Sequence, residues 1–311
     1  MTPLQGFRRA DGNFGIRNHL FTLPAVVCAN QVAIDVGMRH PQLKYIEHQH
    51  GCAQIGADLL QTRHIFSQLA LHPNVYGSMM VSLGCEGLVA RELFNKISSQ
   101  TAKPLKLVVI QDSGGTLKAE EQVEQWVLQT EGQAESQPRE LMNWRDVTIG
   151  LMFDKDTSQG SSLLKQLLSV LHELGARIVL PSSHRDLAQG LSSALSTVSH
   201  GSAHSDAVWA MEPGSNILET ATGLTAAGVH AILHLTAQPH AFGSPLAPTL
   251  RWCLDTHVYA EFYDDFDGPL RDGLDIPRLV EKLARVVNGV PCVAESLGMD
   301  DFALYRIGPT V

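Results

Sequence analysis

The sequence predicts an α/β protein built of two doubly wound units whose sheets are mostly parallel. Three observations support this prediction. Short, β-branched apolar runs alternate along the chain with segments of helical periodicity. The chain has 311 residues, of which 44% are apolar, enough to form two hydrophobic cores. A polar stretch near the middle separates two halves that each show this alternation.

Eight apolar runs have the length and composition of buried strands. They are His19–Val27, Leu43–Glu47, Tyr76–Leu83, Leu105–Gln111, Val147–Phe153, Ala176–Leu180, Ala207–Met211 and Val229–Thr236. The segments between them have helical periodicity: Asn30–Met38, Ile55–Leu71, Leu88–Ser98, Leu117–Gln129, Ser161–Leu174, Arg185–Leu195 and Ile217–Ala227. Strands that alternate with helices in this order favour parallel sheets with right-handed crossovers.

The polar segment Glu131–Asp146 is the expected linker between two domains, because it lacks apolar periodicity. We therefore expect one domain over residues 1–140 and a second over residues 141–311. A further polar segment, Thr197–Asp206, is expected to be a surface loop.

Composition argues against several classes of protein. The formal net charge is −9 and no Lys/Arg run occurs, which argues against a nucleic-acid partner. No apolar stretch reaches the roughly 18 residues that span a bilayer, and the N-terminus lacks an apolar signal core, so we expect a cytoplasmic protein without a membrane partner. The five cysteines contain no CxxC pair, and a disulfide framework is not expected.

The loop after the second expected strand carries two histidines and a thiol. His48, His50 and Cys52 lie within five residues, just before a helix. These are natural ligands of a borderline divalent metal, and a helix N-terminus favours the thiolate form of a cysteine. The alternative is a buried structural cysteine beside two solvated histidines.

Two further loops follow expected strands, where ligands of open α/β sheets normally bind. The first, Gly84-Cys85-Glu86-Gly87, presents a thiol and a carboxylate. In the second, Gly114 and Gly115 precede a helix and could offer backbone N–H groups to an anion such as a substrate carboxylate; the alternative is a plain helix entry capped by Thr116.

Charged residues occur at two other places. Arg17, beside Asn18, could clamp a carboxylate in bidentate fashion, although such arginines commonly lie on a solvated surface. In the second half, two histidines and three aspartates follow the last expected strand, where a solvated turn is the commoner interpretation. These residues are His234, His240, Asp264, Asp265 and Asp267.

Four segments of the first half stand out together: RRADGNFGIRNHLFTLPAVVCAN, HQHGCAQIGAD, HPNVYGSMMVSLGCE and LVVIQDSGGT. In their order and spacing they resemble the altronate dehydratase/galactarate dehydratase family of sugar-acid hydro-lyases. The similarity resumes in MEPGSNILETATGLTAAGVHAILHLTAQPHAFGSPLAPTLRW and in GVPCVAESLGMDDF.

The resemblance implies a lyase that removes water from a sugar acid such as altronate or galactarate, or from a related hydroxy acid. It also implies help from a divalent metal, Fe²⁺ in particular, with Mn²⁺ or Zn²⁺ as alternatives. Such a metal would neutralise the charge that develops when the proton beside the carboxylate is removed. A small-molecule substrate, a small partner subunit and a homo-oligomer are the expected partners.

Site residues follow from the family motifs together with the loops. The family's "GC" cysteine matches Cys52, its histidine matches His48, and its "GCE" matches Gly84, Cys85 and Glu86. We expect His48, Cys52 and Cys85 to bind the metal, and His48 and Glu86 to take part in catalysis. Substrate binding is expected from Arg17, Asn18, Gly114 and Gly115.

The second half departs from the family pattern. The family's "GLECGGSD" run corresponds here to GLMFDKD at residues 150–156, and its "TTGRG" turn to Leu235–Pro239. A segment around a "PGNKAGG" motif is missing. These losses favour an alternative function: a non-catalytic ligand-binding or partner subunit that kept the dehydratase scaffold.

Overall fold

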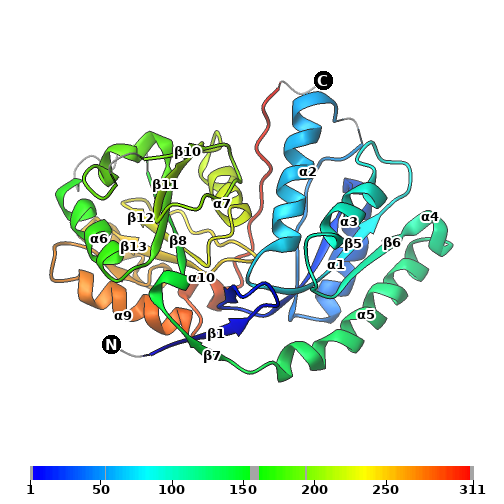
Figure 1. The fold of residues 1–311 in the computed structure, drawn as a ribbon, viewed down its shortest axis with the longest axis horizontal. Helices are drawn as coiled ribbons and strands as arrows, with labels where there is room; N and C mark the ends of the chain where they lie inside the picture. Colours follow the sequence, from blue (N-terminus) through cyan, green and yellow to red (C-terminus); the bar gives the residue numbers. More distant parts are fainter. Residues whose placement is uncertain (1–2, 53, 155–160, 193–194, 309–311) are drawn as a thin grey trace. The chain divides into compact units, whose positions relative to one another are not determined.

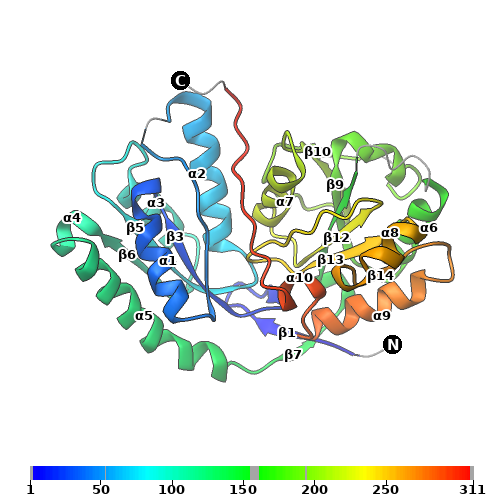
Figure 2. The same ribbon diagram turned by 180° about the vertical axis from the view of Figure 1, so that it is seen from behind.

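A computed structural model describes residues 3–52, 54–154, 161–192 and 195–308. The chain forms two compact units, each treated separately below (Figures 1 and 2). The N-terminal unit consists of Phe7–Arg139 and Phe302–Val311, and the C-terminal unit of Met1–Gly6 and Glu140–Asp301. The first residues of the chain thus belong to the C-terminal unit, and the last residues belong to the N-terminal unit. The expected division into residues 1–140 and 141–311 does not contain this exchange.

The N-terminal unit is built on a parallel sheet with strand order β4-β3-β5-β6. Its strands are β3 (His19–Pro24), β4 (Leu43–Tyr45), β5 (Val75–Ser82) and β6 (Leu105–Val109). Helices α1 (Asn30–Arg39) and α5 (Thr116–Ser136) pack against each other, as do α2 (Gly56–Leu71) and α3 (Ala90–Ser98). The short helices η1 (Val27–Ala29) and α4 (Ile110–Ser113) follow β3 and β6.

One hydrophobic core lies between this sheet and the α1–α5 pair. It joins Val32 and Val36 of α1 to Val123 and Trp126 of α5, with Met79 of β5 buried beneath them. The apolar positions of both helices recur at helical spacing, so that each helix buries one face.

The C-terminal unit contains a parallel sheet whose described strands have the order β10-β11-β9-β8-β12-β13-β14. These strands are β8 (Thr148–Phe153), β9 (Arg177–Pro181), β10 (Thr197–Val198), β11 (Val208–Met211), β12 (Ala231–Thr236), β13 (Thr249–Cys253) and β14 (Gly268–Pro269). Every residue of β8, β11, β12 and β13 is buried, which explains why three of them appear in the sequence as continuous apolar runs.

The helices of this unit are α6 (Ser161–Glu173), α7 (Ile217–Ala226), α8 (Thr256–Glu261), α9 (Ile276–Val287) and α10 (Val293–Ser296), with 3₁₀ turns η2 (Trp144–Asp146), η4 (Ser182–Ala188) and η5 (Tyr263–Asp265). At the start of the chain, β1 (Leu4–Arg8) pairs antiparallel through Leu4–Gly6 with β7 (Glu140–Met142). Its last residues, Phe7 and Arg8, pair with β2 (Phe14–Gly15).

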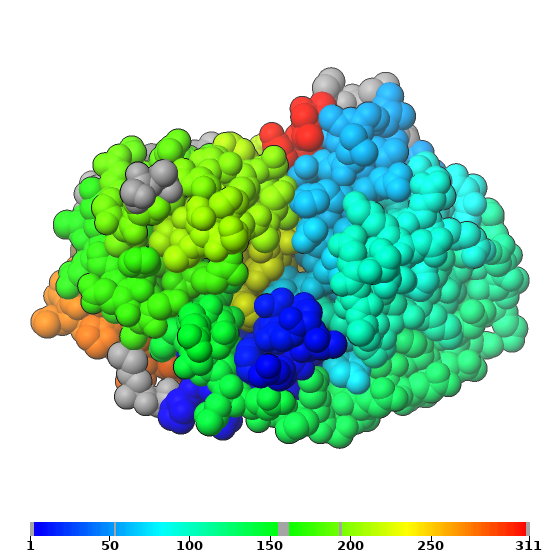
Figure 3. Space-filling model, in the orientation of Figure 1, coloured from blue at the N-terminus to red at the C-terminus, as the bar shows by residue number. Residues whose placement is uncertain are grey.

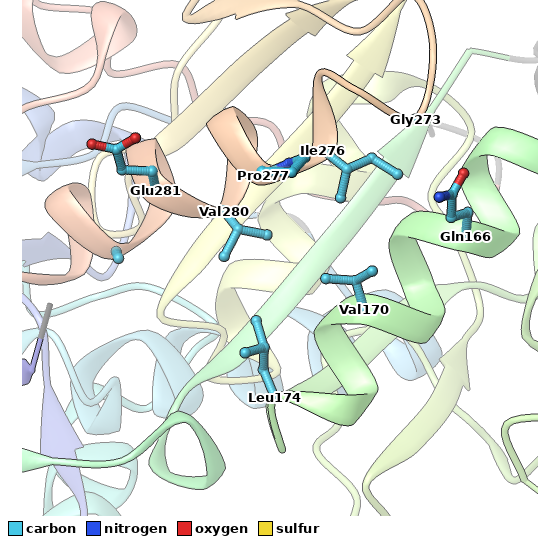
Figure 4. A pocket seen from close by; sticks show the side chains of 9 residues that line it. Gln166, Val170, Leu174, Gly273, Ile276, Pro277, Val280 and Glu281 are labelled. Atoms are coloured by element: carbon cyan, nitrogen blue, oxygen red, sulfur yellow. The ribbon is translucent and has the colours of Figure 1, made fainter. Parts of the chain in front are cut away.

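A cavity of about 590 Å³ lies between α6 and α9 (Figure 4). Its walls are apolar, with Val170 and Leu174 on one side and Ile276 and Val280 on the other. Among the described residues that line it, Glu281 is the ionisable one. Within the described part of the chain, no helix combines the length and the apolar character that crossing a bilayer requires.

The predicted α/β class with parallel sheets is confirmed, and all eight expected strands are present with shifted ends. The helix expected at Arg185–Leu195 is wrong: the described residues there form the 3₁₀ turn η4. His184 has non-helical dihedral angles, and Gly190 has φ +94°, which ends the turn. Residues 193 and 194 lie outside the described residues.

The expected linker begins too early, because α5 continues through Ser136. Thr130 and Ala134 are buried and carry the packed face of α5 beyond Glu131. The helix stops at Gln137, which precedes Pro138 and has extended dihedral angles, as the residue before a proline normally does. The polar loop expected at Thr197–Asp206 begins with a short strand, β10.

Candidate functional site

The carboxyl edge of the N-terminal sheet brings together the loops that follow its four strands. The N–H of Val27, after β3, donates to the carbonyl of His50, after β4, at 2.9 Å. The N–H of Gly87, after β5, donates to the carbonyl of Gly51 at 3.2 Å. In parallel sheets this edge is the normal place for a ligand. The backbone bonds therefore fix a set of loops where a site is expected.

Two glycines permit this close packing. Gly51 has φ +107°, and a Cβ atom there would lie 2.7 Å from the carbonyl oxygen of Ala25. Gly84 has φ +118°, and its Cβ would meet the side-chain oxygen of Gln111, after β6, at 2.7 Å. At Gly51 both the backbone conformation and the lack of space exclude larger residues, whereas at Gly84 the backbone conformation disfavours them.

Three of the four loops carry a solvent-exposed thiol. Cys28 follows β3, Cys52 follows β4 and Cys85 follows β5. Cys52 directly follows Gly51, whose carbonyl binds the loop of Cys85. Cys253 and Cys292, in the other unit, are buried, and burial raises the pKa of both thiols. The exposed thiols thus belong to neighbouring loops at one edge.

His48 is a buried residue that holds its own loop in place. Its Nε2 lies 2.8 Å from the carbonyl oxygen of Pro24, and its Nδ1 accepts the N–H of His50 at 3.1 Å. The ring must therefore carry its proton on Nε2 and be neutral. Burial lowers its pKa to about 4, against the opposing effect of the bond to Pro24. Both ring nitrogens of His48 are occupied by backbone groups.

Glu86 also bonds within its own loop. One carboxylate oxygen accepts the hydroxyl of Ser82, and the other accepts the N–H of Gly84 at 2.8 Å. The half-buried carboxylate thereby closes the turn that presents Cys85.

The arrangement does not supply the ligand set expected for a divalent metal. Among the described residues, no three His, Cys, Asp or Glu side chains are placed to hold one ion. His48 would have to break a backbone hydrogen bond to become a ligand. With these residues as they stand, we derive no chemical step through a metal.

Arg17 and Asn18 lie at the opposite edge of the sheet, because they precede β3 rather than follow it. A strand of this length spans roughly 20 Å. The guanidinium of Arg17 donates to the carbonyl of Ile16 at 2.9 Å, and the amide of Asn18 donates to the carbonyl of Ala134 at 2.6 Å. Strand direction therefore separates these two expected substrate-binding residues from the thiols at the carboxyl edge.

Gly114 and Gly115 lie at the carboxyl edge, after β6, but their amides are used within the turn. Both N–H groups donate to the carbonyl of Ile110, the bond from Gly115 measuring 3.0 Å. Their positive φ angles, +89° and +117°, produce the sharp turn from α4 into α5. This geometry corresponds to the helix-entry alternative, with Gly115 rather than Thr116 at the N-cap.

Sequence reasoning missed a cation at this site, Arg306. The last described residues lie beside α2 (Figures 1, 2 and 3), where the N–H of Ile307 donates to the Asp58 carboxylate at 2.7 Å. Arg306 Nη2 donates to His50 Nδ1 at 3.1 Å. Since 256 residues separate this pair, no local pattern could reveal it.

His50 consequently differs from His48 in what it can offer. It is half-buried, and its pKa is lowered by burial and by the charge of Arg306, against the opposing charge of Asp58. Because the guanidinium donates to Nδ1, the proton of the neutral ring lies on Nε2. The resulting site combines a cation, a neutral imidazole, three thiols and a carboxylate.

Two models of one protein family match the chain in sequence order. Residues 6–135 match the second domain of D-galactarate dehydratase/altronate hydrolase, and residues 189–310 match the C-terminal domain of D-galactarate/altronate dehydratase. The chain belongs to this family. The first match contains all the thiol-bearing loops, and the second contains Arg306.

Three relatives show how far the similarity extends. An altronate dehydratase of Bacillus subtilis (strain 168) is 29% identical over 125 residues, 37% of this chain and 25% of that protein. An altronate dehydratase of Escherichia coli (strain K12) is 33% identical over 93 residues, 27% of this chain and 19% of that protein. The matched part is thus about a quarter or less of either enzyme.

The third relative is similar over nearly its whole length. The (2R)-sulfolactate sulfo-lyase subunit beta of Chromohalobacter salexigens is 24% identical over 97% of both chains.

Proposed function

We propose that this chain is a lyase that removes water from a hydroxylated carboxylic acid, with a sugar acid such as altronate or galactarate as the first candidate substrate. The observation that carries the proposal is the set of loops joined at the carboxyl edge of the N-terminal sheet, where Arg306 meets the thiol-bearing loops. Family membership supports the reaction class.

Arg306 is the proposed binding group for the substrate carboxylate. A guanidinium binds a carboxylate through two parallel hydrogen bonds, and Arg306 is half-buried at the site, whereas Arg17 lies at the other edge of the sheet. Contact with a carboxylate would also draw the guanidinium away from His50 and free Nδ1 of that ring.

His50 is the proposed proton acceptor. Elimination requires a base for the proton beside the carboxylate, and a neutral imidazole is the form that can accept it. The lowered pKa keeps His50 neutral near pH 7. His48 positions the loop that carries His50. Direct participation of Glu86 in catalysis and of Cys85 in metal binding stays a prediction.

The test is the formation of a 2-keto acid by purified protein prepared without oxygen and supplied with Fe²⁺. The substrates are galactarate, altronate and sulfolactate. We expect keto acid from at least one of them, and loss of most activity in Arg306→Ala. Arg278→Ala, an exposed arginine of α9, is the matched control and should behave as wild type. If no substrate yields a keto acid, the proposal fails.

A second candidate function is that of a partner subunit without activity of its own. The observation that favours it is the alignment over 97% of both chains with a protein described as a subunit beta. Here the isolated chain should be inactive on all three substrates, and activity should appear only after a small second subunit is added. Activity of the isolated chain would exclude this candidate.

A further inference from the structure

The strand order of the C-terminal sheet creates a second place where a ligand is expected. From β8 the chain proceeds outward through β9 and β11, and it then returns to place β12 on the other side of β8. Adjacent strands whose connections leave in opposite directions form a crevice outside their carboxyl ends, and open α/β sheets bind ligands there. In this unit that switch point lies between β8 and β12.

Asp154, the residue that follows β8, stands at this switch point and is held by the end of β12. Its Oδ2 accepts the hydroxyl of Thr236 at 2.5 Å and the N–H of Ala237 at 3.1 Å. Its Oδ1 lies 3.4 Å from Nε2 of His234. The carboxylate is therefore fixed in orientation by donors from the neighbouring strand.

His234 is fully buried, with a ring directed at Asp154, and within the described structure its Nδ1 lacks a hydrogen-bond partner. Burial lowers the pKa of His234, while Asp154 acts in the opposite direction. The ring is therefore neutral and donates through Nε2. The imidazole thus adds a third contact from β12 to the Asp154 carboxylate.

Asp154 itself remains ionised and partly accessible. Burial acts to raise its pKa, but the bonds from His234, Thr236 and Ala237 outweigh this effect and lower it. About 19% of its side chain is exposed. His184, after the adjacent strand β9, is half-buried and bonds to the backbone of Asp154, which extends the polar edge over three strands.

We propose that Asp154 is the hydroxyl-binding carboxylate of a small-molecule site at the β8/β12 switch point, and that its ligand is polyhydroxylated. An ionised carboxylate only accepts hydrogen bonds, so the ligand must supply O–H or N–H donors. The buried cation Arg251, on the adjacent strand β13, disfavours an ammonium ligand. Among neutral donors, hydroxyl groups are those that the proposed substrate class carries. Asp154 lies in residues 136–188, which neither family model covers.

The test compares the binding of two six-carbon dicarboxylates by calorimetric titration of the full chain. Galactarate carries hydroxyl groups and adipate does not; this choice of probe rests on the proposed function. The comparison is made in an Arg306→Ala background, which removes the proposed carboxylate contact of the first site. In this background we expect galactarate to bind more tightly than adipate, and Asp154→Asn to weaken galactarate binding roughly tenfold or more without changing adipate binding. The control Asp264→Asn, an exposed acid of η5, should bind galactarate as the Arg306→Ala chain does.

Unchanged galactarate affinity in Asp154→Asn would overturn the proposal, as would equal affinity of the Arg306→Ala chain for both compounds or binding of neither. If circular dichroism shows that Asp154→Asn does not fold, Thr236→Val replaces it. This variant should weaken galactarate binding selectively, because it removes one hydrogen-bond donor to Asp154.

Asp154-dependent binding without keto acid formation would leave this inference standing and refute the lyase. Keto acid formation with binding independent of Asp154 would refute this inference alone.

Discussion

At the scale of single residues, neighbours rather than residue type decide what each histidine does. His48 and His50 are two positions apart, and their rings stack with centroids 6.2 Å apart. Backbone groups occupy both nitrogens of His48, whereas His50 contacts the side chain of a cation, Arg306. The sequence predicts that these histidines matter, but it cannot reveal which of them is satisfied by backbone groups, because Pro24 and Arg306 lie far away along the chain.

His48 should make stability depend on pH. Its pKa is about 4 in the folded protein and 6.5 in the unfolded chain, so the unfolded state binds the proton more readily. Its contribution is fully present above pH 6.5 and is lost as the pH falls toward 4. Between pH 7.5 and 5 we expect it to reduce the free energy of unfolding by about 2 kcal/mol.

Urea denaturation of wild type and His48→Asn at both pH values measures this contribution. The variant should be less stable at pH 7.5 and should lose less stability on acidification. His204→Asn is the control, since His204 is a partly exposed residue of the other unit. An equal loss in wild type and His48→Asn would contradict the buried, neutral state of His48.

The occupied nitrogens of His48 also lead to a prediction about metal content. After loading with Fe²⁺ without oxygen and desalting, we expect the protein to retain less than one iron per chain, as measured by atomic absorption. The ligand hypothesis drawn from the sequence predicts the opposite: one iron per chain, lost in Cys85→Ala and kept in Cys253→Ala. That result would show that His48 exchanges its backbone bonds for a metal.

At the scale of elements, the sequence predicts eight of the described strands but not β1, β2, β7, β10, β13 or β14, and it predicts the geometry between loops poorly. Continuous apolar runs such as Val147–Phe153 identify buried parallel strands. β13 was missed because Arg251 interrupts its apolar run; the structure buries this guanidinium over the ring of Phe266, at 4.6 Å, and bonds it to carbonyl groups. Buried charges satisfied by distant backbone cannot be recognised from a local pattern.

Glycines at loop contacts should be far less replaceable than glycines in helices. Gly51→Ala should destabilise the protein by about 2 kcal/mol or more, because it adds a strained φ and a Cβ atom within 2.8 Å of Val26 Cα. Gly132→Ala, within α5, meets nothing within 4 Å and should stabilise by about 0.5–1 kcal/mol. Thermal unfolding of both variants tests this, and similar melting temperatures would contradict the packing of Gly51.

At the scale of the whole molecule, each end of the chain belongs to a different unit from the residues that adjoin it in sequence. Leu4–Gly6 pair with β7 of the C-terminal unit, while Phe302–Val311 return to the N-terminal unit. The proposed carboxylate-binding residue is thus brought to the thiol-bearing loops only when the last segment has docked. Bringing the last segment to these loops closes a long loop, which costs conformational entropy.

Docking of that segment should depend on Asp58, in the first turn of α2. Its carboxylate accepts the amides of Ile307 and Gly308, at 2.7 Å and 3.2 Å, and hydrogen bonds to a charged acceptor are among the stronger ones. Asp58→Ala should therefore increase deuterium uptake of residues 302–308 and reduce lyase activity as Arg306→Ala does. Asp264→Ala, a change at an exposed acid of η5 in the other unit, should change neither. Unchanged exchange in Asp58→Ala would mean that other contacts hold Arg306 at the site.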